Sequence, residues 1–249
     1  MHSQQHLWTF LLFGSSYNVS PYILINGVAF ILGILFLDHR LTKLLPEEAH
    51  NKIYKIFILS IVSGWVGAHL FDGVVRDLSF LQAGFSFYGG ILFGFLIYTL
   101  LFFLLCSNKI FISTLNIAVA PLVISHAIGR LGCYFAGCCY GKILQHDHFL
   151  NNFFIRHPTQ LYESLYLFII FIFLVFHGKY RGIENDVYFY VYFYCAFRFF
   201  IEFLRGDDRG FWLGMSTSQW VSATLLFMAT IFLIVKSNKK HLTLRIVLT

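Results

Sequence analysis

Residues 85–105 read FSFYGGILFGFLIYTLLFFLL and contain no Asp, Glu, Lys or Arg. A helix needs about 20 predominantly apolar residues to cross the ~30 Å hydrocarbon core of a bilayer, and this segment has that length. It lies within a longer charge-free stretch, 78–108, whose first part, 78–82, we interpret as an interfacial lead-in. The segment therefore predicts a membrane-spanning helix.

The composition of the whole chain agrees with this prediction. Of its 249 residues, 58% are hydrophobic, 20% are aromatic and only 12% are charged, whereas soluble domains carry about 25% charged residues. This composition excludes a soluble globular protein and a disordered chain. The net charge of +6 is spread along the chain rather than gathered in one patch, so we expect the lipid bilayer and no nucleic acid as its partner.

Six further apolar stretches lie on either side of the first one. They are 21–37, 56–71, 110–129, 160–176, 187–204 and 217–235. Together the stretches predict an all-α integral membrane protein with about seven transmembrane helices and a small polar segment on the outer side. They use most of the chain, so we expect a single polytopic membrane domain over residues 1–249. Residues 1–13 lack the basic region of a secretory signal and are expected to lie at the membrane interface.

The loop charges predict an orientation. Eleven of the 18 Lys and Arg residues fall on one side of the predicted spans and seven on the other. The positive-inside rule makes the first side cytoplasmic, which places the N-terminus outside and the C-terminus in the cytoplasm. The polar segments 129–157 and 198–214 then lie on the outer side.

The sixth predicted span carries three ionisable residues. Arg198, Glu202 and Arg205 are spaced i, i+4 and i+7, which places them on one face of a helix. Charges within a span are costly and usually mark function. One interpretation is a self-neutralising ion-pair ladder. The other is an anion site, in which Glu202 holds one guanidinium and the other binds a phosphate, while residues 207–209 form a solvated loop.

A glycine-rich segment follows the fourth predicted span. Residues 126–141 read HAIGRLGCYFAGCCYG, with glycines at 129, 132, 137 and 141. Glycine is unfavourable in a helix interior, so this run predicts a broken helix that approaches a ligand or another helix closely. Arg130 at such a break suits an anionic head group. The alternative is a glycine-rich turn with a snorkelling arginine.

Two more polar segments border predicted spans. Residues 156–163 read RHPTQLYE, in which Pro158 suits the first turn of a helix. This start brings His157, Gln160, Tyr162 and Glu163 near the outer membrane surface. At the start of the third span, Tyr88 is either an interfacial anchor or a hydroxyl of the site.

Five cysteines are present, and three of them, Cys133, Cys138 and Cys139, fall in the glycine-rich segment. Their CxxxxCC spacing is not a standard zinc pattern, and a site would need His126 or His157 to complete it, so we assign no metal. A disulfide in an oxidising compartment and a reactive thiol near Arg130 both stay open. Cys106 and Cys195 are expected to be packing residues.

These motifs, in their order, resemble the bacterial prolipoprotein diacylglyceryl transferase family. Residues 129–132 with Gly141 are similar to its GRxGNFxNxExxG signature, residues 157–163 to its HP[ST]QLYE motif, and residues 196–205 to its AFRxxxExxR helix. Residues 215–219 match a short motif before its last span more loosely. The chain departs from the family pattern at several polar positions. Cys133, Ala136 and Cys138 replace Asn, Asn and Glu, Tyr88 replaces a His, and Asn26 replaces a Tyr.

The resemblance implies an activity and its substrates. The family transfers the diacylglyceryl group of phosphatidylglycerol to the thiol of a lipobox cysteine in prolipoproteins, at the outer face of the bacterial plasma (inner) membrane, without a cofactor. Its essential arginines correspond to Arg130 and Arg198, and we expect Glu202 to orient Arg198. We expect lipid or precursor binding at the positions Tyr88, Arg130, Gly141, His157, Gln160, Tyr162, Glu163 and Arg205.

The substituted positions leave other hypotheses open. The chain is alternatively a non-catalytic or altered-specificity lipid-binding relative. Another hypothesis is a transferase that uses a different lipid or thiol acceptor, with Cys133 or Cys138 as a transient carrier. A small anion transporter is a weaker alternative, because the polar residues gather on one side and no inverted repeat is found. If Tyr88 replaces the family histidine, the base that accepts the thiol proton is sought among His126, His157 and a Cys133 thiolate.

Overall fold

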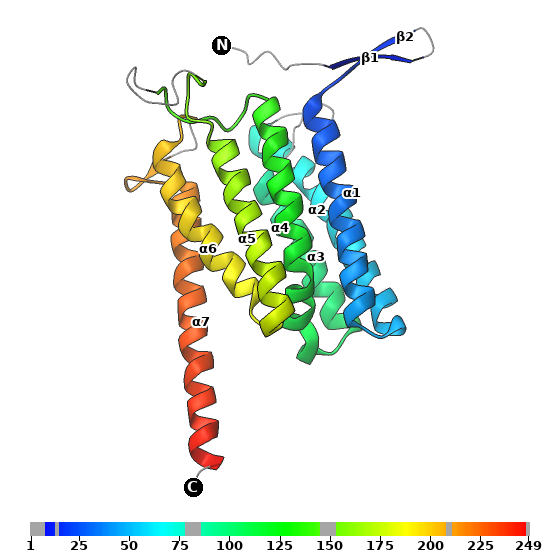
Figure 1. Cartoon of the computed structure of the whole chain (residues 1–249), viewed down its shortest axis with the longest axis vertical. Coiled ribbons are helices and arrows are strands. Elements are labelled where there is room, and N and C mark those ends of the chain that lie inside the picture. Colours follow the sequence, from blue (N-terminus) through cyan, green and yellow to red (C-terminus); the bar gives the residue numbers. More distant parts are fainter. Residues whose placement is uncertain (1–7, 13–14, 78–85, 145–152, 208–210, 248–249) are drawn as a thin grey trace. The chain divides into compact units, whose positions relative to one another are not determined.

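A computed structural model describes residues 8–12, 15–77, 86–144, 153–207 and 211–247 of the chain. The described residues contain seven α-helices (Figure 1): α1 Pro21–Leu44, α2 Glu47–Arg76, α3 Phe87–Leu105, α4 Phe111–Phe135, α5 Thr159–Arg181, α6 Asp186–Ile201 and α7 Thr217–Val247. Two antiparallel hairpins, β1 Trp8–Leu12 with β2 Ser15–Val19 and β3 Phe211–Trp212 with β4 Met215–Ser216, and the 3-10 turns η1 Asn108–Ile110 and η3 Glu202–Leu204 complete the fold.

The predicted all-α membrane architecture is confirmed. Among the described residues, six helical segments are long and apolar enough to cross a membrane, and Gly89–Leu105 forms a shorter apolar helix. Large apolar side chains such as Leu104, which is 70% exposed, cover their outer faces. Such exposure suits side chains that face lipid. The predicted lead-in at 78–82 and the start of the third span at residue 85 lie outside the described residues.

The predicted break in the fourth span is wrong. Helix α4 continues through Gly129 and Gly132 and ends at Phe135. The glycines serve close packing instead. A Cβ on Gly132 would lie 2.6 Å from Asn26 Nδ2, and a Cβ on Gly129 would lie 3.2 Å from Asn26 Oδ1. The predicted close approach of the glycine run to another helix is therefore confirmed. The helix itself, however, continues without a break as far as Phe135.

The chain divides into two compact units, Leu35–Ala118 and Met1–Ile34 with Val119–Thr249. In the unit Leu35–Ala118, glycines bring α2 and α3 together. A Cβ on Gly64 would lie 2.9 Å from the Gly90 carbonyl oxygen, and Gly94 lies against the Ser60 carbonyl. Small residues allow such close approach between membrane helices. Tyr98 of α3 also hydrogen-bonds Thr114 at 2.7 Å, which links α3 to the start of α4.

Hydroxyl groups tie the helices of the other unit together. Ser125 donates to the Ala29 carbonyl at 2.9 Å, which links α4 to α1, and Ser164 donates to the Ala127 carbonyl at 2.8 Å, which links α5 to α4. The rings of Tyr166 and Phe197 stack between α5 and α6. The end of α4, the start of α5, the end of α6 and the start of α7 thereby come to the same end of this unit (Figure 1).

We expect Gly64→Ala to lower the thermal stability of the detergent-solubilised protein. The new methyl group would meet the Gly90 backbone, and overpacking of this kind costs about 1–3 kcal/mol. The matched control is Gly27→Ala, because a Cβ there has no neighbour within 4 Å and alanine is the better helix former. Equal melting temperatures for the two variants would contradict the proposed glycine contact.

Candidate functional site

The three polar motifs converge at one end of the unit that comprises Met1–Ile34 and Val119–Thr249. Gln160 Nε2 donates to the Cys138 carbonyl at 2.5 Å, which joins the start of α5 to the turn after α4. Gly141 pairs with Arg205 in an isolated antiparallel bridge, which joins the same turn to the end of α6. Segments that are far apart in the sequence therefore form one polar cluster.

Arg130 and Glu163 form the first ion pair of this cluster. Arg130 Nη2 lies 2.9 Å from Glu163 Oε1, and the Glu163 side chain is completely buried. Tyr194 OH donates to the same carboxylate oxygen at 2.7 Å. Glu163 therefore compensates the charge of Arg130 inside the protein. Its role in substrate binding stays a prediction.

Arg198 and Glu202 form the second ion pair, at 2.8 Å, with both side chains buried. This is the i, i+4 contact that the spacing predicts. Arg198 Nη2 also donates to Ser218 Oγ at 3.1 Å. Ser218 is held at the start of α7 by a capping box, in which the Ser216 backbone N–H donates to Gln219 Oε1 and the Gln219 N–H donates to Ser216 Oγ.

The prediction that Arg205 shares a helix face with Arg198 is wrong. Helix α6 ends at Ile201, the turn η3 follows, and Arg205 has extended backbone with φ −71° and ψ 142°. Its guanidinium forms two hydrogen bonds of 2.7 Å to the Asp207 carboxylate. Asp207 is therefore a buried arginine's partner rather than part of a solvated loop, while residues 208 and 209 lie outside the described residues. Burial disfavours the charged guanidinium, but Asp207 and the nearby Cys139 sulfur outweigh it and raise the pKa of Arg205.

The two membrane-embedded arginines keep unused donors. Arg130 Nε and Arg198 Nη1 are buried and make no hydrogen bond within the described part of the chain. Two acceptors of the same cluster, Gln160 Oε1 and Glu163 Oε2, are also buried without a donor there. Buried polar atoms without partners are costly. This arrangement therefore indicates a site for a ligand that carries both an anionic group and hydroxyl groups.

Gly141 lies where three backbone segments cross. Its N–H donates to the His157 carbonyl, and the N–H of Lys142 donates to the Leu204 carbonyl. A Cβ on Gly141 would lie 2.5 Å from His157 Cβ and 2.8 Å from the Leu204 carbonyl oxygen. Only glycine fits at this crossing, so Gly141 allows the three backbone segments to approach one another.

His157 borders a cavity of about 420 Å³ beside the cluster. His157 Nδ1 lies 3.4 Å from Tyr162 OH. The wall is largely aromatic and apolar; it consists of Tyr134, Gly137, Tyr140, Phe153, Phe154, Ile155, Arg156, His157, Pro158 and Gln160. This cavity is open to the surface rather than enclosed.

Two further sequence candidates belong to α4 and α3. His126 is within α4, and its Nδ1 lies 3.2 Å from Tyr190 OH. Tyr88 belongs to the first turn of α3, in the other compact unit, and its side chain lies outside the described part of the structure. His126 belongs to the cluster through Tyr194: the two rings lie 5.1 Å apart in an edge-to-face arrangement, and Tyr194 OH donates to Glu163.

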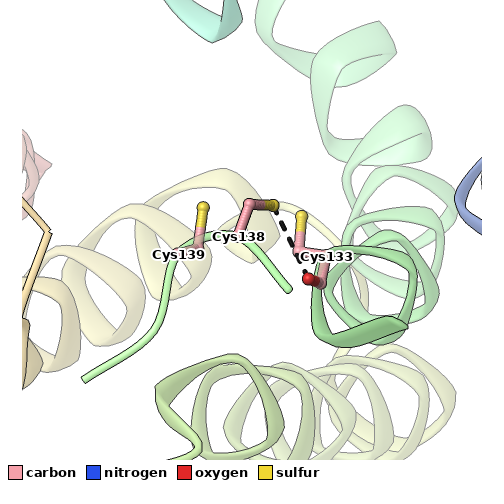
Figure 2. Close-up of side chains that lie close together, drawn as sticks. All are labelled: Cys133, Cys138 and Cys139. Carbon is pink, nitrogen blue, oxygen red and sulfur yellow. Dashed lines mark hydrogen bonds between the residues drawn. The ribbon is translucent and has the colours of Figure 1, made fainter. Parts of the chain in front are cut away.

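The three cysteines of the glycine-rich segment lie close together. Their sulfur atoms all lie within 4.8 Å of one another, and Cys138 Sγ donates to the Cys133 carbonyl at 3.6 Å (Figure 2). The structure holds them as thiols rather than as a disulfide. Hydrogen bonds from the Cys133 and Cys138 thiols, and then the Arg205 charge, lower the pKa of Cys139, whereas the pKa of Cys138 is raised by its thiol neighbours and by burial.

Several residues of the cluster were not predicted. Thr159 Oγ1 donates to the Cys139 carbonyl at 2.7 Å, and Ser218 and Asp207 each contact an arginine. Asp207 follows Arg205 by two residues, so their pairing could have been predicted from the sequence. Ser218 carries no comparable signal, because its partner Arg198 is 20 residues away.

Comparisons with known proteins identify the family of the chain. The family described as prolipoprotein diacylglyceryl transferase matches residues 10–235. The chain is 32% identical over 220 residues to the phosphatidylglycerol–prolipoprotein diacylglyceryl transferase of Clostridium tetani, covering 79% of this chain and 86% of the relative. It is 31% identical over 217 residues to phosphatidylglycerol–prolipoprotein diacylglyceryl transferase 2 of Clostridium perfringens, covering 78% and 84%. The chain belongs to the prolipoprotein diacylglyceryl transferase family, and the predicted resemblance is confirmed.

We expect Glu163→Gln to destabilise the protein strongly, because it leaves the buried Arg130 guanidinium without its carboxylate. Removing one partner of a buried ion pair costs about 3–5 kcal/mol. The control is Asp38→Asn, whose pair with His50 is partly exposed and for which about 0–1 kcal/mol is expected.

Thermal unfolding in detergent measures both variants, and a double-mutant cycle with Arg130→Met isolates the pair. The double variant should recover part of the loss, because no unpaired charge is left. Strictly additive losses would show that Arg130 and Glu163 are not energetically coupled.

Proposed function

We propose that this member of the family transfers the diacylglyceryl group of phosphatidylglycerol to the thiol of the lipobox cysteine in prolipoprotein signal peptides. The observation that carries the proposal is the pair Arg130 and Arg198. Each guanidinium is held by a buried carboxylate, and each keeps one buried donor, Arg130 Nε and Arg198 Nη1, without a protein partner among the described residues. Such donors suit a phosphate that enters the site.

The acceptors of the cluster match the rest of this headgroup. Phosphatidylglycerol carries two hydroxyl groups beyond its phosphodiester. Gln160 Oε1 and Glu163 Oε2 are buried acceptors without donors in the described structure. Both residues belong to the start of α5, where Glu163 also pairs with Arg130 through its other oxygen. Donors for the phosphate and acceptors for the hydroxyls thus come from neighbouring residues, which favours this lipid over one with a cationic headgroup.

The reaction asks the protein mainly for positioning and charge stabilisation. The cysteine sulfur attacks the glyceryl carbon that bears the phosphate, so a C–S bond forms while the C–O bond breaks. Glycerol phosphate leaves with the bonding electron pair on its oxygen. Arg130 and Arg198 stabilise the charge that grows on this oxygen, Glu202 orients Arg198, and Glu163 orients Arg130. His157, at the cavity wall, is our candidate to take up the thiol proton.

The same proposal places the protein in the bacterial plasma membrane as a multi-pass protein with its site at the outer face. The bias of Lys and Arg among the loops supports an N-terminus outside and a C-terminus in the cytoplasm. Phosphatidylglycerol enters sideways from the bilayer, and the precursor approaches through its own signal helix. The single membrane domain predicted for the whole chain belongs to this proposal as well.

The test is transfer in a defined system. The purified protein is mixed with vesicles that contain radiolabelled phosphatidylglycerol and with a lipobox peptide that carries either Cys or Ser. Label on the Cys peptide alone supports the proposal. Lipid binding without transfer would instead identify a non-catalytic lipid-binding relative. This alternative is tested because the signature positions 133 and 138 carry cysteines in this chain.

We expect Arg198→Ala to abolish transfer and Arg198→Lys to retain little, because a lysine ammonium cannot replace the planar fork that contacts Glu202, Ser218 and the phosphate at once. Losing such a group lowers kcat by about 10²–10³-fold. Arg181→Ala is the matched control, since Arg181 is exposed at the end of α5. Near-normal turnover of the lysine variant, measured with the labelled lipid, would remove Arg198 from the phosphate-binding role.

Reporter fusions test the orientation. We expect a green fluorescent protein fused after residue 249 to fluoresce and alkaline phosphatase fused there to be inactive, because the tail is predicted to be cytoplasmic. Fusions after residue 152, which follow four predicted spans, should give the opposite pair of signals. An active phosphatase after residue 249 would reverse the predicted orientation and move the site to the cytoplasmic face.

A further inference from the structure

We propose that Cys133, Cys138 and Cys139 bind one thiophilic divalent cation such as Zn²⁺, and that its fourth coordination position receives the acceptor thiol. The second half of this proposal rests on the proposed transferase function, whereas the first half stands on the geometry of the three thiols. No residue of the family pattern requires such a site, and two of the three sulfurs occupy positions where that pattern has Asn and Glu.

The positions of the sulfur atoms suit a single metal ion. All three lie within 4.8 Å of one another, and Figure 2 shows them on one side of the turn that follows α4. With Zn–S bonds of about 2.3 Å, sulfurs on one tetrahedral ion lie about 3.8 Å apart. A contraction of about 1 Å or less, which side-chain rotation supplies, brings the thiols to that spacing. No backbone rearrangement is needed.

The backbone holds the cysteines in this arrangement. Gly137 and Cys139 both have left-handed conformation, with φ of 65° and 63°, so the turn folds back on the end of α4. A left-handed cysteine is rare, and strained residues of this kind gather at functional sites. The carbonyls of Cys138 and Cys139 accept hydrogen bonds from Gln160 and Thr159 at the start of α5. The three thiols are thereby preorganised by contacts that involve no sulfur atom.

Two guanidiniums favour the charged form that a metal requires. Arg130 Nη1 lies 4.0 Å from Cys139 Sγ, and Arg205 hydrogen-bonds the same sulfur. Metal ligands of this type are thiolates, so cations beside them ease deprotonation. Both arginines are themselves held by carboxylates, Glu163 and Asp207. A divalent ion bound by three thiolates carries a net charge of about −1, which the flanking arginines accommodate.

The donor set also leaves room for a fourth ligand. Catalytic zinc sites have three protein ligands and an open position for water or substrate, whereas structural sites are closed. His126 and His157, the residues that would close a four-ligand site, contact Tyr190 and Tyr162 instead. Neither belongs to the group of residues that the described structure places around the three sulfurs.

An open position here fits the acceptor of the transfer reaction. A thiol that binds the metal loses its proton, which passes by way of the displaced water to His157, the proton acceptor proposed above. The metal-bound sulfur then attacks the glyceryl carbon, a C–S bond forms, the C–O bond breaks, and glycerol phosphate leaves. Arg130 contacts both the cysteine cluster and Glu163, so it places the phosphate next to the metal-bound sulfur.

Metal binding is tested first and without lipid. The full-length protein in detergent is reduced, freed of metal with a chelator, and titrated with Co²⁺ and with Zn²⁺ against a chromophoric chelator. We expect one ion per chain and sulfur-to-cobalt charge-transfer bands. Loss of a residue that only hydrogen-bonds a metal ligand weakens metal binding by about 10–100-fold. Loss of a ligand itself should weaken Zn²⁺ binding by more than this, and we expect that result for each of the variants Cys133→Ser, Cys138→Ser and Cys139→Ser.

The controls are the two cysteines outside the cluster. Cys106 and Cys195 lie at the end of α3 and within α6, so Cys106→Ser and Cys195→Ser should leave the affinity unchanged. The metal site is refuted if the wild-type chain binds no ion, or if the three thiols are found as a disulfide by a mass two hydrogens lower. Thermal melting of each variant checks that it is folded.

The acceptor position is tested on the cobalt-loaded protein. A lipobox peptide with Cys should strengthen the charge-transfer band, because a fourth sulfur joins the ion, and the Ser peptide should not. An unchanged spectrum refutes the open position. Failure of the proposed function looks different: the ion and the spectral change would be present, but no label would pass from phosphatidylglycerol to the peptide.

Discussion

A guanidinium that is buried in a membrane domain needs a carboxylate next to it, because its charge has lost the water that would otherwise stabilise it. In this chain the pairs are Arg130 with Glu163, Arg198 with Glu202, and Arg205 with Asp207. The first pair joins α4 to α5. The second holds the end of α6 near α7 through Ser218, and the third fixes the chain after α6. The same contacts that neutralise the charges also bring the polar motifs to one place.

The turn after α4 depends on these pairs. It is crowded at Gly141, where the backbones of His157 and Leu204 approach closely, and it is bent by the left-handed residues Gly137 and Cys139. Such a turn keeps its shape because Thr159 and Gln160, at the start of α5, donate hydrogen bonds to two of its carbonyls. The ion pair of Arg130 and Glu163 in turn joins α5 to α4. Residues that do not touch a ligand thus determine the geometry that a ligand would meet.

The sequence predicted the parts of this arrangement that depend on local patterns. Apolar runs located the helices, and the i, i+4 spacing of Arg198 and Glu202 located their ion pair. Both features are local, because each can be recognised from residues that are close together in the sequence. The pairing of Arg130 with Glu163 was not predicted, since it joins residues 33 positions apart and each motif was interpreted by itself.

The glycines at 129 and 132 were taken as a helix break. A glycine that breaks a helix and one that lets Asn26 approach have the same sequence signal, and only the tertiary contact distinguishes them. The left-handed conformation of Cys139 carried no signal either, because cysteine rarely adopts it.

The cysteines show why substitutions in this site have to be considered together. Relative to the family pattern, Cys133 and Cys138 replace an amide and a carboxylate, and either change alone would only remove a polar contact. In the structure their sulfurs lie beside that of Cys139, on a turn that Thr159 and Gln160 hold in place. Of the three sulfurs, that of Cys139 lies 4.0 Å from Arg130 Nη1, while Arg130 keeps Glu163 as its carboxylate partner. A sulfur at this place becomes an anionic group comparable to a carboxylate once it is deprotonated or bound to a metal. Under the metal site proposed above, the substituted positions would change how the acceptor thiol is activated, while the two arginines would keep their proposed role toward the phosphate.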